Sequence, residues 1–327
     1  SRYTVDENWL IPHFEKMLYD NIQFILLLSK FFKIKQNNYF LKKINQTTNF
    51  LLTNFISKET DLLGSAFDAD SEGKEGKYYI YNYEELKNIK DIEYYYDVRP
   101  EGNWEGKIIL DEIKKEPPNE IIDKLIKIRS QRKKPFFDEK NQLDLNCLWV
   151  STLISLNSII QDVDYLKTAE HFYEKIENKF CVKNIFHSYS KDISFIEDYA
   201  YLIQCLLDLF DATMNPKYRL LAKKYCDEAM KKFYDEKIKV FQKNEKTKND
   251  IFMTPIDIGD NILPNANSIM LINFSRLGML VQAKELSNSL NGYLNVYKNF
   301  MISSLKALDF FQEIDNGKNC NSEGCEI

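Results

Sequence analysis

The stretch from Trp9 to Asp20 constrains the fold most, because it leads from a polar segment into a long apolar pattern. Pro12 stands where the first turn of a helix tolerates proline. Apolar residues then recur at steps of three and four, at Phe14, Met17 or Leu18, Ile22, Ile25, Leu28 and Phe32. We therefore predict a helix that begins near residue 13, with one core face and with His13, Glu15 and Lys16 in its first turn.

Further apolar patterns of this kind predict helices along most of the chain. The expected ranges are 39–57, 119–132, 146–160, 164–180, 197–213, 216–234, 265–277, 280–290 and 292–308. Asn37 or Asn38 can cap the first of these. Short loops join the helices in pairs, and long loops precede the helices that begin near 13, 146, 197 and 265. The pattern predicts an all-α chain in which a ring of helical hairpins brings the starts of its inner helices around one cavity.

Small β-structures are expected between the hairpins. Residues 63–81 indicate two short strands around an acidic loop, with strand propensity in 78–81. Asn82 and Glu85 have the spacing of a capping box. Residues 100–106 indicate a turn-rich loop, 240–254 a loose hairpin, and 320–327 an irregular tail.

Composition excludes several classes of function. The net charge of -5, without a basic stripe, argues against a nucleic-acid partner, and no apolar run reaches the roughly 18 residues of a membrane span. The six cysteines are sparse and include no C-x-x-C pair, which indicates a reducing, cytoplasmic compartment. With only 3 His in the chain, a His-rich zinc site is not expected, and we predict neither a metal nor a cofactor.

The predicted helix starts carry polar side chains, and one acidic loop and one aromatic residue accompany them. This set suits a polyhydroxylated ligand, because amides and carboxylates bind hydroxyl groups and an aromatic face packs on sugar C–H groups. As proton-transfer groups we select His13 and Asp198. The residues expected to bind the sugar are Glu15, Lys16, Asp68, Asp70, Trp104, Asn146, Glu197, Tyr199, Asn265 and Asn267.

Structural roles are the alternative explanation for several of these residues. Asp198, Asn265 and Asn146, taken singly, are expected to be helix caps, and His13 is as consistent with a structural histidine as with a proton carrier. The acidic loop at Asp68 lacks the frame of an EF-hand, so a solvated turn is the better interpretation. Cys320 and Cys325 could bind metal or form a disulfide, but two further ligands are missing.

Several motifs together resemble the YyaL/spermatogenesis-associated protein 20 family. The longest is Arg2-Tyr-Thr-Val-Asp-Glu-Asn-Trp-Leu-Ile-Pro-His-Phe-Glu-Lys-Met-Leu-Tyr-Asp20. Others are residues 67–78, 101–107 and 197–203, and weaker matches are 129–140, 264–268 and the Cys320/Cys325 pair. This resemblance implies an (α/α)6 barrel of the six-hairpin glycosidase type, preceded by a thioredoxin-like domain. The expected domains are a barrel over residues 1–312, without the thioredoxin-like domain and the first barrel helices, and a tail over 313–327.

The resemblance implies a fold more than a reaction, and we weigh three functions. The first is a carbohydrate-active or carbohydrate-binding barrel with isomerase, epimerase or glycosidase chemistry on a sugar. The second is a non-catalytic scaffold that recognises a protein or glycan together with a thioredoxin-like domain. The third is a degenerate scaffold, which the loss of the family's Trp and Gly on either side of Asn146 favours. Only His13, and after it His187, can be placed near the cavity mouth as counterparts of the two histidines that the epimerases use.

Overall fold

The computed structural model describes residues 2–113, 116–160, 164–182, 184–188, 193–245, 255–317, 320–321 and 324–325. The chain divides into two units. The first unit comprises Ser1–Asn21 and Gly64–Glu139, and the second comprises Ile22–Leu63 and Lys140–Ile327. Among the described residues, no helix is both long enough and apolar enough to cross a membrane.

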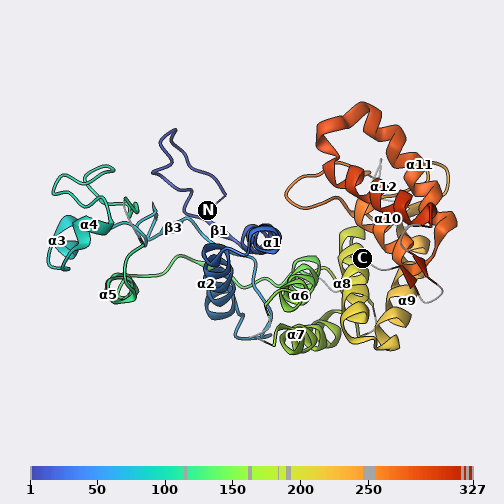
Figure 1. Ribbon diagram of the computed structural model, residues 1–327, viewed down its shortest axis with the longest axis horizontal. Coiled ribbons are helices and arrows are strands. Elements are labelled where there is room, and N and C mark those ends of the chain that lie inside the picture. Colours follow the sequence, from blue (N-terminus) through green and yellow to red (C-terminus); the bar gives the residue numbers. More distant parts are fainter. Residues whose placement is uncertain are drawn as a thin grey trace. The chain divides into compact units, whose positions relative to one another are not determined.

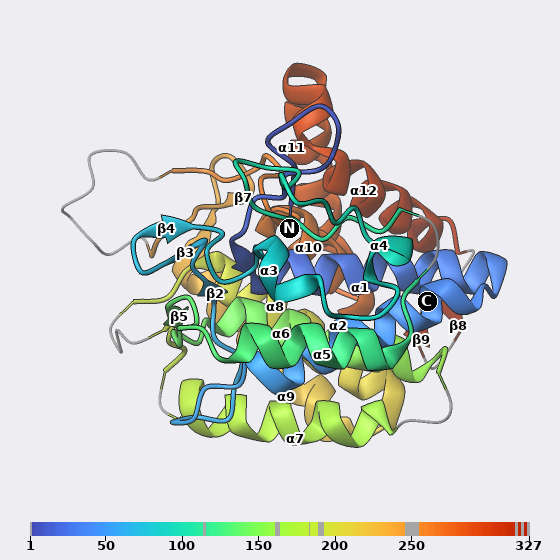
Figure 2. The same ribbon diagram turned by 90° about the vertical axis from the view of Figure 1, so that its left-hand side faces the viewer.

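Helical hairpins form most of the second unit (Figure 1). The helices are α1 (Leu18–Lys35, of which the first turn belongs to the first unit), α2 (Asn38–Asn54), α6 (Leu143–Asn157), α7 (Tyr165–Phe180), α8 (Ile196–Thr213), α9 (Pro216–Phe233), α10 (Ala266–Leu277), α11 (Leu280–Tyr297) and α12 (Ile302–Asp315). Helices α6, α8, α10 and α12 pack on one another in succession, while α7, α9 and α11 pack on α6, α8 and α10. In Figure 2, α7 runs below α6, on which it packs. This two-layer order of hairpins is the arrangement expected from the sequence.

Burial separates the two layers. On α6 and α8 almost every side is buried, including the large side chains of Trp149 and Tyr201. On α7 and α9 one apolar face is buried, with Ile176 and Phe233 among its residues, and the other face is polar. Polar residues on the inner helices therefore need protein partners, and several of these residues lie in the first turns.

Side-chain caps set several helix starts. Asn37, Asp164 and Asn265 each accept a hydrogen bond from a backbone N–H in the first turn of α2, α7 and α10. The predicted capping box is confirmed, because the Asn82 N–H donates to Glu85 Oε2 over 2.8 Å. Helix boundaries predicted next to these caps agree with the structure to within one residue, except at the end of α2.

The first unit holds short strands and a small core. Strands β1 (Lys16–Met17), β2 (Ala66–Phe67) and β5 (Phe137–Asp138) form an antiparallel sheet in the order β1-β2-β5, and β3 (Asp70–Ser71) pairs with β4 (Lys74–Glu75). Helices α3 (Tyr83–Leu86), α4 (Ile92–Tyr95) and α5 (Asn119–Ser130) surround a core that includes Tyr81, Ile108 and Leu125. Gly76 has φ +71°, and a Cβ there would lie 2.6 Å from the Phe14 ring.

The predicted helix start near residue 13 is wrong. Lys16 and Met17 pair with Phe67 and Ala66 as strand β1, so the helix begins only at Leu18. Its core face is nevertheless as predicted, since Leu18, Ile22, Ile25, Leu28 and Phe32 are buried, as is Phe14 before the helix. Long-range strand pairing here overrides the local helical pattern.

Four smaller predictions also change. Gly292 does not divide two helices, because α11 continues through it to Tyr297; a glycine inside a helix costs only about 1 kcal/mol. In the segment 78–81 only Tyr81 forms a bridge, with Ile108. The expected 240–254 hairpin is instead the pair β6 (Tyr234–Asp235) and β7 (Val240–Phe241), and residues 246–254 lie outside the described residues. In the tail, β8 (Cys320–Asn321) pairs with β9 (Gly324–Cys325).

Candidate active site

A histidine and two aspartates gather where α6 and α8 begin. His187, in the loop before α8, lies with its Nδ1 2.8 Å from Asp198 Oδ1. Asp198 is fully buried in the first turn of α8, and its Oδ2 accepts the Phe195 N–H over 2.8 Å. Both oxygens of Asp198 are thus occupied, so this carboxylate caps its helix and also orients the imidazole ring.

Asp144 completes the group, called here the His187 cluster (Asp144, His187 and Asp198). One ligand atom from each of the three side chains lies within 4.8 Å of the other two. Asp144 is buried in the first turn of α6, and its Oδ1 accepts the Leu145 N–H over 2.8 Å. Burial, and then the negative charge of Asp198, raise the pKa of Asp144 to about 7. This carboxyl group can therefore gain or lose a proton near neutral pH.

The surroundings of His187 favour its protonated form. Burial opposes the positive charge, but the hydrogen bond and charge of Asp198, together with the charges of Asp144 and Glu197, outweigh burial and raise the pKa of His187. In the neutral ring, Nδ1–H donates to Asp198, and Nε2 can accept from the Gln142 amide nitrogen 3.3 Å away. The side chain of His187 keeps 22% of its surface exposed, so a small molecule can approach it.

A second polar group joins the start of α8 to the loop before α10. Lys243 Nζ lies 3.1 Å from Glu197 Oε1 and 3.8 Å from Asp257 Oδ2. Glu197 Oε2 is buried and has no hydrogen-bond partner among the described residues. Burial raises the pKa of Glu197 in spite of Lys243. An unsatisfied buried carboxylate oxygen next to the His187 cluster is a place where a ligand hydroxyl could donate.

The same three side chains were tested as a metal site. A histidine and two carboxylates are a donor set that divalent transition metals accept. The hydrogen bond between His187 Nδ1 and Asp198 Oδ1 occupies one possible ligand atom of each residue, so a metal would have to displace this bond or use other atoms of the two side chains. As it stands, the arrangement holds a proton between these two groups.

The structure places the predicted residues of the second unit in two groups. Asp198 and Glu197 belong to the polar groups described above. The other four make structural contacts. Asn146 binds the backbone of Leu63, Asn265 caps α10, Asn267 binds the backbone of Phe241, and Tyr199 packs in the core against Phe233. Capping is thus confirmed for Asn265 and for Asp198, which also binds His187, whereas Asn146 holds a distant backbone segment.

The predicted residues near the N-terminus lie in the first unit. His13 stacks on Tyr3 with ring centroids 4.7 Å apart, and its Nδ1 is buried, 4.0 Å from Glu15 Oε2. Glu15 forms an ion pair with Arg2. Lys16 lies 4.3 Å from the centroid of the Tyr79 ring, and burial lowers its pKa to about 8. Glu15 and Lys16 thus make contacts within the first unit, whereas the Nδ1 of His13 has no hydrogen-bond partner among the described residues.

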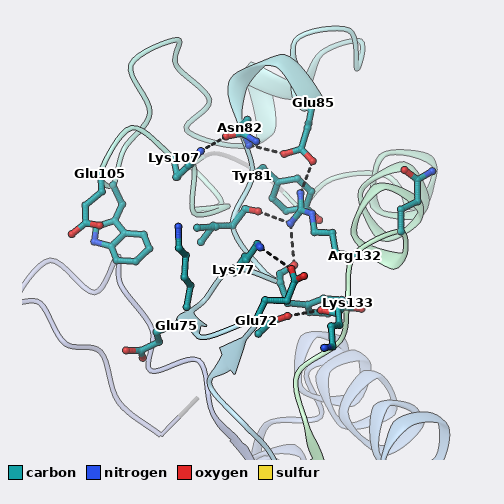
Figure 3. A pocket seen from close by; sticks show the side chains of 16 residues that line it. Glu72, Glu75, Lys77, Tyr81, Asn82, Glu85, Glu105, Lys107, Arg132 and Lys133 are labelled. Carbon is teal, nitrogen blue, oxygen red and sulfur yellow. Dashed lines mark hydrogen bonds and ion pairs between the residues drawn. The ribbon is translucent and has the colours of Figure 1, made fainter.

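The acidic loop and Trp104 also lie in the first unit. Asp68 and Asp70 are exposed, and Asp68 Oδ1 accepts the Asp70 N–H. Trp104 contacts Phe14 and lines a cavity, whereas the two aspartates do not line it (Figure 3). The structure therefore does not bring these three predicted binding residues together.

The sequence places Asp144 among the polar residues at the helix starts, but the residues selected from it do not include Asp144, Gln142 or Lys243, and His187 is ranked below His13. One signal was present. Asp144 and Asp198 occupy the first turns of two long, nearly all-apolar segments, and each such turn can hold only a few polar side chains. The separation of His187 from Asp144 by 43 residues hides the cluster in the sequence, and only the packing of α6 on α8 brings the residues together.

Comparison with known proteins identifies relatives of this chain, although no family model matches it. Human spermatogenesis-associated protein 20 is 24% identical over 341 residues, which cover 84% of this chain and 43% of the human protein. The uncharacterized Caenorhabditis elegans protein B0495.5 is 26% identical over 353 residues, with 89% and 48% covered. The chain thus spans less than half the length of these curated relatives.

Solved structures share the fold. A sugar epimerase from a ruminal bacterium gives a TM-score of 0.55 at 11% identity and covers 90% of this chain and 64% of its own. Cellobiose 2-epimerase from Spirochaeta thermophila gives a TM-score of 0.55 at 10% identity, with 96% and 77% covered. The expected mainly α, (α/α)6-barrel type of fold is confirmed.

Proposed function

Since the chain belongs to the family of spermatogenesis-associated protein 20, and its fold is that of an (α/α) barrel, we propose that its helical unit acts on a sugar by proton transfer at the His187 cluster. The hydrogen-bonded pair of His187 and Asp198, with Asp144 beside it, carries this proposal. Sugar epimerases among the proteins of similar fold make a sugar the first ligand class to test.

The pair suits general base catalysis. With Nδ1–H donated to Asp198, the lone pair of His187 lies on Nε2, and a sugar that displaces the Gln142 amide from Nε2 can lose to it a proton from a carbon next to the carbonyl group. The Asp198 carboxylate then stabilises the imidazolium ion that forms. Asp144, which changes protonation near neutral pH, can give a proton to the sugar oxygen and take it back.

Isomerase or epimerase chemistry fits this geometry better than glycoside hydrolysis. Glycosidases usually place two carboxyl groups on opposite sides of the bond, about 5 Å or more apart, and both face the substrate. Both oxygens of Asp198 are bonded within the protein, so Asp144 is the only one of the two with an oxygen left for a ligand among the described contacts.

Exchange of solvent deuterium into sugars, followed by NMR, tests this function. A panel of aldoses, ketoses and reducing disaccharides should include a sugar whose C2 proton exchanges. His187→Gln should slow the exchange at least about 100-fold, the lower range for loss of a general base. His171→Gln is the matched control, because His171 lies exposed on α7, and it should leave the rate unchanged. His13→Gln tests the histidine preferred by sequence reasoning.

Equal exchange by His187→Gln and the unchanged protein would contradict the assigned role. If no sugar exchanges, thermal melting against the same panel separates binding from catalysis. A sugar present at 100 times its dissociation constant stabilises by about 2.7 kcal/mol. Stabilisation by a sugar without exchange would leave a carbohydrate-binding barrel.

An exposed apolar stripe on α1 favours a second candidate. Phe24, Leu27, Phe31 and Ile34 lie at helical spacing with 42–77% of their surface exposed. Such a stripe suits the non-catalytic scaffold that works with a thioredoxin-like domain. Leu27→Glu with Ile34→Glu should abolish binding of that domain, taken from a full-length relative, while leaving any sugar exchange intact.

A further inference from the structure

The first unit contains a cavity of about 980 Å³ (Figure 3). Its walls are the β3–β4 hairpin, the segment that leads into α3, the turn at 104–107 and the residues that follow α5. A volume of this size matches the sites that hold small ligands. All lining residues belong to the first unit, so the cavity is separate from the His187 cluster.

Arg132 joins several of the segments that line this cavity. Its guanidinium group donates to the backbone oxygen of Tyr78 over 3.0 Å and to Glu85 Oε1 over 2.8 Å, and it lies 4.5 Å from the centroid of the Tyr81 ring. Ser71 Oγ donates to the Lys133 backbone oxygen over 2.6 Å, which ties the hairpin to the segment after α5. The lining side chains therefore project from segments joined by hydrogen bonds.

Positive charge remains uncompensated inside the cavity. Lys77 pairs with Glu72 over 2.7 Å, and Arg132 pairs with Glu85. Lys107 Nζ instead donates to the neutral side-chain oxygen of Asn82 over 2.5 Å and has no carboxylate partner among the described residues.

The other two carboxylates of the lining do not supply this partner. In Figure 3, the carboxylate groups of Glu75 and Glu105 point away from the side chains of Lys107 and Arg132. The lining has five basic side chains, including Lys74 and Lys133, against four carboxylates, so the cavity favours a negatively charged group, and Lys107 is one of the cations that can receive it.

The remaining lining suits hydroxyl groups. Trp104 offers a partly exposed aromatic surface, and Asn82 and Gln131 offer amide groups that donate and accept. We propose that this cavity binds a small polyhydroxylated anion, either a sugar acid or a sugar phosphate. Lys107 binds the anionic group, and Trp104 packs against the C–H face of the ring. This site does not depend on the function proposed for the His187 cluster.

Tryptophan fluorescence tests the site directly. The chain has three tryptophans. Trp149 is fully buried in the second unit, and Trp9 is 80% exposed, so the Trp9→Phe variant of the chain leaves Trp104 as the exposed reporter. Titration with glucuronate and with glucose 6-phosphate should change the emission and saturate. Whichever of the two binds more tightly shows whether the natural ligand is a sugar acid or a sugar phosphate.

Three comparisons decide the outcome. Lys107→Gln should weaken binding at least tenfold, whereas Lys87→Gln, an exposed lysine paired with Glu84 outside the cavity, should leave it unchanged. Neutral glucose should bind at least tenfold more weakly than the anion. Inorganic phosphate should bind more weakly than glucose 6-phosphate, since it lacks the ring.

The proposal is overturned if neither anion binds at millimolar concentration, or if Lys107→Gln and Lys87→Gln bind the anion equally well. It is also overturned if glucose binds as tightly as the anions, or if inorganic phosphate binds as tightly as glucose 6-phosphate. Each variant's melting temperature is measured alongside, and Lys107→Arg provides a charge-preserving variant that should keep most of the affinity. Sugar exchange at His187 should be the same in all these variants, so the failure of one site is distinguishable from failure of the other.

Discussion

Asp144→Asn should change how the stability of the chain depends on pH. The pKa of Asp144 is about 7 in the folded chain against an ordinary value of 3.8. Since the folded state holds the proton to higher pH than the unfolded state, this group's contribution to stability is present below about pH 4 and is lost as pH rises to about 7. The loss is at most about 1.4 kcal/mol per pH unit, or about 4 kcal/mol over the whole range. Asparagine does not titrate, and its side-chain oxygen can still accept the Leu145 N–H.

Urea unfolding at roughly unit steps from about pH 4 to about pH 8 measures this effect. The free energy of unfolding of Asp144→Asn, minus that of the unchanged chain, should rise with pH and level off above about pH 7. His187 also contributes to the pH dependence of stability, because its pKa is raised in the folded chain. Its stabilising contribution is present below its ordinary pKa of 6.5 and is lost at higher pH, so this loss occurs at higher pH than that of Asp144. Asp164→Asn, at the exposed start of α7, controls for replacing a helix-start aspartate. A difference that stays constant within about 0.5 kcal/mol across the range refutes the reasoning.

Three further predictions concern buried contacts and metal binding. Asn146→Ala should lower the free energy of unfolding by about 1–3 kcal/mol in urea, because it leaves the buried N–H of Leu63 without its side-chain acceptor, while the C=O of Leu63 keeps the amide of Asn141 as a donor. Arg276→Ala should cost about 3–5 kcal/mol by the same measurement, since the buried guanidinium pairs with Asp208 over 2.7 Å and its removal leaves that carboxylate unpaired. Zn²⁺ or Mn²⁺ should not raise the melting temperature, because metal binding would compete with the hydrogen bond between His187 and Asp198.

Each of these outcomes has a matched control. Ser158→Ala, at an exposed helix end, should change stability by less than about 0.5 kcal/mol, and a similar small value for Asn146→Ala would contradict its assigned contact. Lys284→Ala removes an exposed ion pair with Asp315 and should cost under about 1 kcal/mol, so an equal loss in Arg276→Ala would mean that burial contributes nothing there. A rise in melting temperature with metal that Asp198→Asn abolishes would establish a metal centre in place of the proton-transfer pair.

Much of the helical unit was predictable because its signals are local. Caps such as Asn37 and Asn265 lie next to the residues that they bind, and apolar spacing marks each core face. The start of α1 was not predictable in this way, since Lys16 and Met17 are drawn into a strand by a partner 50 residues away. No local pattern carries that information.

The candidate site was predictable only in part for the same reason. Asp198 could be chosen because it lies at a helix start. Its role in the site, however, depends on His187 and Asp144, which come from a loop and from another helix. Asn146 and Asn267 look alike in the sequence as polar residues at inner-helix starts, and both bind backbone groups instead of a ligand. Residue type at a helix start does not distinguish a ligand contact from a backbone contact.

His187 is attached to two helices at once. Its backbone oxygen accepts the N–H of Leu143 at the start of α6 over 3.0 Å, while its ring is bonded to Asp198 on α8. Sliding of one hairpin against the next should therefore stretch one of these two bonds, and stretching of the bond to Asp198 would alter the proton affinity of the ring. The imidazole nitrogen resonances of this single residue would then report the spacing of adjacent hairpins, so an NMR titration would measure motion in the helical layer without any added label on the backbone.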